Sequence, residues 1–194
     1  ENLSIEDLSL LRFVHTLEIT AKNLYEHTLQ NIQEIQTLKL KVARIHPDSL
    51  SHLNVHSLEI ETNELDDNLV PPKNIHTLNL KAYYVNNLSS FLENLKGIHT
   101  LDVSGLRSLT DEDLVHLQGI HTLKICSCDR ITGEGFKYLK GIETLELSRL
   151  LSISVESLVY LEDFHTLKIN SCRRISKRAL ENFSSYFEGI LMYS

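Results

Sequence analysis

Six histidines occupy the same place in a segment that recurs along this chain of 194 residues. Each is followed by Thr or Ser, and Gln36 and Glu143 take the same place in two further copies. Neighbouring imidazoles could share a metal ion or sense acid, because histidine has an unperturbed pKa of about 6.5 and protonated neighbours repel each other. A residue repeated so regularly also meets a structural need of the segment, and we favour that interpretation. The row consists of His15, His56, His76, His99, His121 and His165.

Three cysteines, Cys126, Cys128 and Cys172, are the other candidates for chemistry. Cys126 faces outward from its strand, Cys128 takes the inward position at the turn that follows, and Cys172 lies two copies from Cys128, roughly 10 Å away at the usual strand spacing and beyond disulfide reach. We therefore predict no metal site and buried structural thiols at Cys128 and Cys172. The chain contains no G-x-S-x-G, P-loop or H-E-x-x-H sequence, so we predict neither an enzyme nor a bound cofactor.

Composition limits the partners. The 26 Asp and Glu outnumber the 19 Lys and Arg, for a formal charge of −7. Phosphate binding needs clustered positive charge, so a nucleic-acid partner is not expected. No apolar run approaches the roughly 18 residues that a membrane span needs. Few cysteines favour an intracellular, cytoplasmic setting, although glycosylation-type triplets at Asn2, Asn87 and Asn182 leave an extracellular one open.

The elements that position these residues follow from the recurring unit of 20 to 23 residues. Inside each copy the apolar residues follow the pattern L-x-x-L-x-L, and residues two apart on a strand face the same side. We predict one parallel strand per copy, with residues such as Leu101 and Leu123 pointing into the core. The copies begin at Val14, Ile35, Val55, Ile75, Ile98, Ile120, Ile142 and Phe164.

This pattern resembles that of the leucine-rich repeat proteins. The predicted fold is a right-handed α/β solenoid, with a curved parallel β-sheet on the concave face and short helices and 3₁₀ or irregular turns on the convex face. We interpret residues 1–194 as a single domain of about eight repeats, in which 1–13 is a partial repeat and 184–194 forms the C-terminal edge. The convex side is expected to be irregular before about residue 97 and helical after it.

From Ile98 onward the period is 22 residues, and a second signature follows each strand. An apolar residue precedes a hydroxyl residue that could cap a short helix, and a glycine precedes the next strand, where a helix end favours a left-handed residue. The expected caps are Thr110, Thr132, Ser154 and Ser176, and the expected left-handed residues are Gly97, Gly119 and Gly141.

The units that contain Cys128 and Cys172 are similar to the cysteine-containing repeats of F-box-type substrate receptors of ubiquitin ligases. In these units the cysteine is followed by Ile131-Thr132 and by Ile175-Ser176. The resemblance implies a substrate-recognition arm, with the adaptor-binding segment outside this chain.

Outward-facing residues between the core positions form rows across the concave sheet. The row of Thr and Ser is the same in every copy and indicates sheet stabilisation. The next rows vary between copies, and recognition should depend on variable positions. Lys39 is predicted to pair with Glu59. Lys124 is predicted to pair with Asp102 and Glu146. The candidate partner-binding residues are Lys39, Lys41, Glu59, Glu61, Asn79, Lys81, Asp102, Lys124, Glu146, Arg149 and Lys168.

Tyrosines, which often anchor protein interfaces, are expected past the strands, toward the loops or the convex side. These are Tyr83, Tyr84, Tyr138 and Tyr160. The predicted function is a non-enzymatic protein-interaction module that binds a partner protein through its repeat surface, most simply as a monomer. The ubiquitin-ligase arm is the alternative, and a pH-responsive or metal-binding histidine array is a lesser one.

Overall fold

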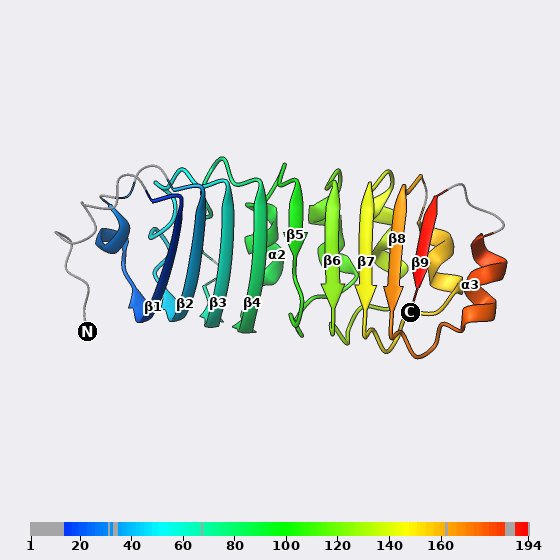
Figure 1. Cartoon of the computed structure of the whole chain (residues 1–194). Coiled ribbons are helices and arrows are strands. Elements are labelled where there is room, and N and C mark those ends of the chain that lie inside the picture. Colours follow the sequence, from blue (N-terminus) through cyan, green and yellow to red (C-terminus); the bar gives the residue numbers. More distant parts are fainter. Residues whose placement is uncertain are drawn as a thin grey trace. The chain divides into compact units, whose positions relative to one another are not determined.

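The computed structural model describes residues 14–30, 32, 35–66, 68–161, 163–184 and 189–193 (Figure 1). The chain divides into two compact units, residues 1–98 and 99–194, which are described one at a time. The predicted partial repeat at residues 1–13 lies outside the described residues.

The first unit contains parallel strands of nine residues each. They pair in sequence order, so that Thr16, Thr37, Ser57 and Thr77 stand side by side. The strands are β1 (Thr16–Leu24), β2 (Thr37–Ile45), β3 (Ser57–Leu65) and β4 (Thr77–Val85). A 3₁₀ helix, η1 (Glu26–Leu29), follows β1, turns follow β2 and β3, and an α-helix, α2 (Leu88–Glu93), follows β4.

The second unit contains shorter parallel strands, and each of the first four is followed by a longer connection. Figure 1 shows the strands of each unit side by side. The strands are β5 (Thr100–Asp102), β6 (Thr122–Cys126), β7 (Thr144–Ser148), β8 (Thr166–Asn170) and β9 (Ile190–Tyr193). The helices are η2 (Glu112–Leu117), η3 (Glu134–Leu139) and η4 (Glu156–Tyr160), which are 3₁₀ helices, and the α-helix α3 (Lys177–Ser184).

The core consists of the residues that the repeat pattern predicts. Leu58 and Leu78 of the first unit, and Leu101 and Leu123 of the second, are at most 1% exposed. Alternation places the polar residues between them on the other side of each sheet. The predicted class, an α/β repeat with a parallel sheet and short helices or 3₁₀ turns, is confirmed. A ninth strand, β9, pairs with β8.

The connecting segments differ in detail from the prediction. The irregular turns after β2 and β3 are as expected, but α2 is an α-helix that begins before residue 97. After residue 97 most of the helices are 3₁₀ rather than α.

The glycines before the strands adopt the predicted left-handed conformation, with φ of 85°, 79° and 75° at Gly97, Gly119 and Gly141. Of the predicted caps, Ser176 acts as expected, because its Oγ accepts a hydrogen bond from the backbone N–H of Ala179 at 3.2 Å.

The capping prediction is wrong in detail for the other three residues. The N–H of Thr110 donates to Asp113 Oδ2 at 2.8 Å, and the N–H of Ser154 donates to Ser157 Oγ at 3.2 Å. Thr132 donates to Asp111 of the preceding repeat. The side chain three residues later, or one repeat earlier, therefore supplies the oxygen.

Candidate functional site

The candidate binding residues lie on the side of each sheet opposite the core, which we call the open face. In-register pairing places Lys39 between Glu18 and Glu59, and Lys41 beside Glu61, as the repeat spacing predicts. The open face of the first unit consists of Glu18, Thr20, Lys39, Lys41, Glu59, Glu61, Asn79 and Lys81. The open face of the second unit consists of Asp102, Ser104, Lys124, Cys126, Glu146, Ser148, Lys168 and Asn170.

Ion pairs neutralise part of the open face of the first unit. Lys39 Nζ lies 3.4 Å from Glu59 Oε2, which confirms the predicted pair. Lys41 Nζ lies 3.9 Å from Glu18 Oε1, a diagonal contact across the first two strands. Both pairs are solvent-exposed, so each contributes at most about 1 kcal/mol to stability. These side chains therefore remain available to a partner at small cost.

Strands β3 and β4 carry the less satisfied groups of the first unit. Glu61 stands in register with both Lys41 and Lys81, yet the ion pairs found among the described residues do not include Glu61 or Lys81. Asn79 Oδ1 is buried without a hydrogen-bond partner. The polar groups at this end of the first open face retain unused hydrogen-bonding and pairing capacity.

In the second unit, Lys124 bridges two carboxylates, as predicted. Its Nζ lies 3.8 Å from Asp102 Oδ2 and 3.5 Å from Glu146 Oε1. The other oxygen of Asp102, Oδ1, accepts hydrogen bonds from the N–H, at 2.9 Å, and the hydroxyl of Ser104. Both carboxylate oxygens of Asp102 are therefore engaged, one by Lys124 and the other by Ser104. Lys168, in register with Glu146, is absent from the ion pairs of the described chain.

Arg149 lies outside the two rows of the open face. It follows β7 in a left-handed conformation with φ of 53°, and its backbone N–H donates to the carbonyl of Asn170 at 2.9 Å. Because arginine has a Cβ atom, this left-handed backbone conformation is unfavourable, and the hydrogen bond to the next strand stabilises it. Its side chain is exposed beyond the end of the strand.

The tyrosine prediction needs a correction for Tyr83 and Tyr84. They lie within β4, not past it, and are 84% and 73% exposed. Tyr84 stands in register with Glu64, which pairs with Arg44 at 2.8 Å. The strands of the first unit run past the L-x-L core positions, and the alternation that continues from Leu80 to the buried Ala82 was the signal for that extension. Tyr138 and Tyr160 lie on η3 and η4, as expected.

The histidine row forms stacked pairs. The ring centroids of His56 and His76 are 4.6 Å apart, and those of His99 and His121 are 4.0 Å apart. The Nδ1 atoms of His76, His99 and His121 lie 3.1 to 3.3 Å from the hydroxyl of the next residue. His76, His99 and His121 thus each contact a histidine ring in an adjacent repeat and the hydroxyl of the Thr that follows. No group of three His, Cys, Asp or Glu able to hold a metal occurs among the residues that were searched, which are the described ones.

The two buried thiols are confirmed. Cys128 is fully buried, its Sγ lies 3.4 Å from the carbonyl of Val103, and burial raises its pKa to about 12. Burial also raises the pKa of Cys172. Both therefore stay protonated at neutral pH and serve as small core residues. Cys126, on the open face, is half-buried.

Comparisons with known proteins place the fold. No protein-family model matches the chain. No curated protein sequence matches it. In the described part of the chain, no helix is long and apolar enough to cross a membrane.

Several solved chains resemble this one, and two of them belong to complexes. The first is the Toll–Spatzle complex of Drosophila, with 13% identity and a TM-score of 0.62 over 82% of this chain and 23% of that chain. The second is the yeast Rad7–Elc1 complex, with 12% identity and a TM-score of 0.64 over 97% of this chain and 56% of that chain. The matched chains are leucine-rich repeat proteins, and this chain spans about a quarter and about half of their lengths. The similarity shows a leucine-rich repeat fold.

Proposed function

We propose that this protein is a non-enzymatic interaction module whose open face binds a partner protein. The observation that carries the proposal is the contrast between rows of the sheet. The Thr row is nearly constant, whereas the rows beginning with Glu18 and Thr20 change residue at each strand. A constant row meets the needs of the fold, and a varied, exposed row suits one particular partner surface. Both similar structures are complexes with a protein partner, which agrees with this proposal.

Charge reversal tests the open face. The immobilised protein is used to capture partners from a lysate of its own cells, and the captured proteins are quantified by mass spectrometry. The Lys41→Glu/Lys81→Glu variant should lose the specific partner, because both side chains are exposed on the open face of the first unit. The matched control, Lys73→Glu/Lys96→Glu, changes the charge equally in the connecting segments and should retain it. Equal capture by both variants would place binding elsewhere.

The alternative is the substrate-recognition arm of an F-box-type ubiquitin ligase. The buried Cys128 and Cys172, each with Sγ near strand carbonyls, agree with the cysteine-containing repeats of that class. The test is whether the full-length gene product co-purifies with a ligase adaptor protein. If it does not, the ligase hypothesis is lost, while the binding-module proposal remains.

The lesser alternative, a pH-responsive or metal-binding array, rests on the stacked pairs His56–His76 and His99–His121. Protonated rings at such distances repel each other, so a sensor should lose thermal stability between about pH 8 and about pH 5. A melting temperature that is constant over this range and unchanged by zinc would remove the hypothesis.

We further propose that the module acts as a monomer inside the cell. The protonated state of Cys128 and Cys172, and the absence of a disulfide among the described cysteines, suit a reducing compartment. Light scattering of the purified chain tests the monomer, and imaging of the tagged full-length protein tests the location.

A further inference from the structure

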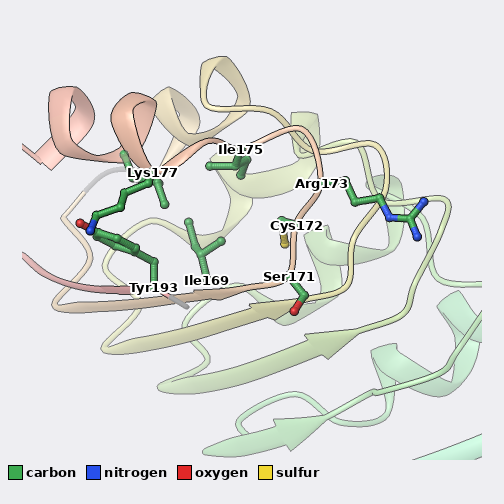
Figure 2. A pocket seen from close by; sticks show the side chains of 8 residues that line it. Ile169, Ser171, Cys172, Arg173, Ile175, Lys177 and Tyr193 are labelled. Atoms are coloured by element: carbon green, nitrogen blue, oxygen red, sulfur yellow. The ribbon is translucent and has the colours of Figure 1, made fainter.

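A hollow of about 550 Å³ lies at the C-terminal edge of the second unit (Figure 2). Its apolar lining includes Ile169 of β8 and Cys172 and Ile175 of the loop that follows. At one end Lys177 of α3 extends along the ring of Tyr193, with Nζ 5.9 Å from the ring centroid. The Cys172 thiol is uncharged at neutral pH because burial raises its pKa, so the floor is apolar.

Positive charge is concentrated around this hollow. Residues 164–180 contain five Lys and Arg and no Asp or Glu, in a chain whose formal charge is −7. The ion pairs of the described second unit involve other side chains. Asp163 and Glu181 border this stretch, so the cations outnumber the adjacent carboxylates, and clustered like charges attract an anionic partner. The five are Lys168, Arg173, Arg174, Lys177 and Arg178, and all except the half-buried Lys168 are exposed.

The neighbouring strand adds an exposed apolar strip. Ile190 and Met192 of β9 stand in register with Thr166 and Lys168, at places where the other strands of this unit carry hydroxyl and charged side chains. They are 47% and 50% exposed. The open face therefore changes from polar to apolar at the same edge that carries the positive charge.

We propose that this edge is a docking site for an acidic, extended segment of a partner protein, with one apolar side chain of that segment in the hollow. Its carboxylates would contact Lys177 and Arg174. This surface is separate from the charged rows of the first unit, so the inference goes beyond the binding proposed for that open face and does not depend on it.

The arrangement of the cations favours an extended acidic segment over a single phosphate. Figure 2 shows Lys177 and Arg173 at opposite ends of the hollow, with Arg173 extending away from it. A single phosphate needs donors that converge on one point, whereas carboxylates spaced along a chain match cations spread along an edge. The apolar floor suits a Phe or Leu side chain, which supplies the desolvated anchor typical of such interfaces.

The test uses the whole chain and a fluorescein-labelled peptide of alternating Glu and Asp with one central Phe. Fluorescence anisotropy should show saturable binding that weakens between about 50 mM and about 300 mM salt, as expected for charge-dependent contacts. Replacing the Phe with Ala in the peptide should weaken binding as well, and a Lys-containing peptide of the same length should not bind.

Lys177→Glu should reduce peptide affinity about tenfold, which corresponds to about 1.4 kcal/mol. The matched control is Lys137→Glu, because Lys137 Nζ also lies over a tyrosine ring, 5.1 Å from the centroid of Tyr138, but away from the hollow. It should bind like the unmodified protein. Arg174→Glu provides a second variant if Lys177→Glu alters the circular dichroism spectrum.

Three results would overturn the proposal. They are no saturable binding of the acidic peptide by the unmodified protein, equal loss of binding in Lys137→Glu and Lys177→Glu, and tighter binding to vesicles of mixed phosphatidylcholine and phosphatidylserine than to the peptide. The last result would assign the edge to an anionic membrane surface instead.

Discussion

The two units solve the same packing problem with different local structures. In the first unit the strands are nine residues long and two of the connections contain only turns, whereas β6, β7 and β8 of the second unit are five residues long and are followed by helices. In the first unit β2 and β3 stay in register past the core positions, with Val42 opposite Thr62 and Arg44 opposite Glu64. In the second unit a left-handed residue directly follows each of β6, β7 and β8, namely Ser127, Arg149 and Ser171. The two forms thus differ in how far each strand continues past its core positions.

The repeats are also tied together differently. In the first unit the buried hydroxyl of Ser49 donates to the carbonyl of Leu24 in the preceding repeat at 3.1 Å. In the second unit the carboxylate of Asp111 accepts four hydrogen bonds from the next repeat, two from Thr132 and one each from the N–H of Gly133 and Gly135, at 2.7 to 3.0 Å. In the second unit a carboxylate on the helical side thus makes the contact between repeats that a buried hydroxyl makes in the first unit.

The largest expected effect tests whether the two cores are equivalent. Leu58→Ala in the first unit and Leu123→Ala in the second should each lower the free energy of unfolding by about 2–5 kcal/mol, because both side chains are buried and leave a cavity. Urea denaturation followed by circular dichroism measures this. The control, Thr122→Ala, should cost well under that amount. Equal, small effects at Leu123 and Thr122 would mean that the inner and outer faces are misassigned.

The next effect concerns the inter-repeat tie of the second unit. Asp111→Ala should lower the free energy of unfolding by about 1–3 kcal/mol, because it leaves backbone N–H groups of the next repeat without their acceptor. Glu112→Ala, one residue away and exposed, should change it by less than about 0.5 kcal/mol. If both variants have the same stability, the tie contributes nothing and packing alone joins these repeats.

Alkaline pH should distinguish the units through Cys128. Its folded pKa, about 12, lies above the unperturbed thiol value of 9.0, so the unfolded chain loses this proton first as pH rises. The stabilising contribution is complete below about pH 9 and is lost between about pH 9 and about pH 12. Urea denaturation at about pH 8 and about pH 10 should show a smaller stability loss in Cys128→Ala than in the unmodified protein. An identical loss of stability in both proteins would mean that the Cys128 thiol does not cause the pH dependence.

The smallest effect concerns the left-handed turn after β7. Arg149 has a φ of 53° at the place that Gly105 occupies two repeats earlier with φ of 82°. Arg149→Gly should raise the free energy of unfolding by about 0.5 kcal/mol, since relief of the left-handed penalty exceeds glycine's entropy cost. Arg130→Gly, at an exposed position without positive φ, should not stabilise. Stabilisation by both variants would point to the charge rather than the backbone.

Much of the fold was predictable because it depends on local period. The spacing of the L-x-x-L-x-L segments identifies the buried positions of Leu101 and Leu123, the register of Lys39 with Glu59, and the left-handed Gly97, Gly119 and Gly141. Parallel strands of equal repeats align residue for residue, so a position in one repeat specifies its neighbour in the next. The buried thiols follow from the same rule.

The repeat period did not predict the features that depend on where each strand ends. Tyr83 and Tyr84 lie on β4 because that strand continues past its core positions, and η2 to η4 are 3₁₀ helices rather than α-helices. The carboxylate of Asp111 reaches Gly135 only when two repeats stack, and the hollow beside Lys177 forms only when β8, its loop, α3 and β9 come together. Repeat spacing specifies which residues are neighbours along the sheet, but the contacts made beyond the strand ends depend on three-dimensional packing.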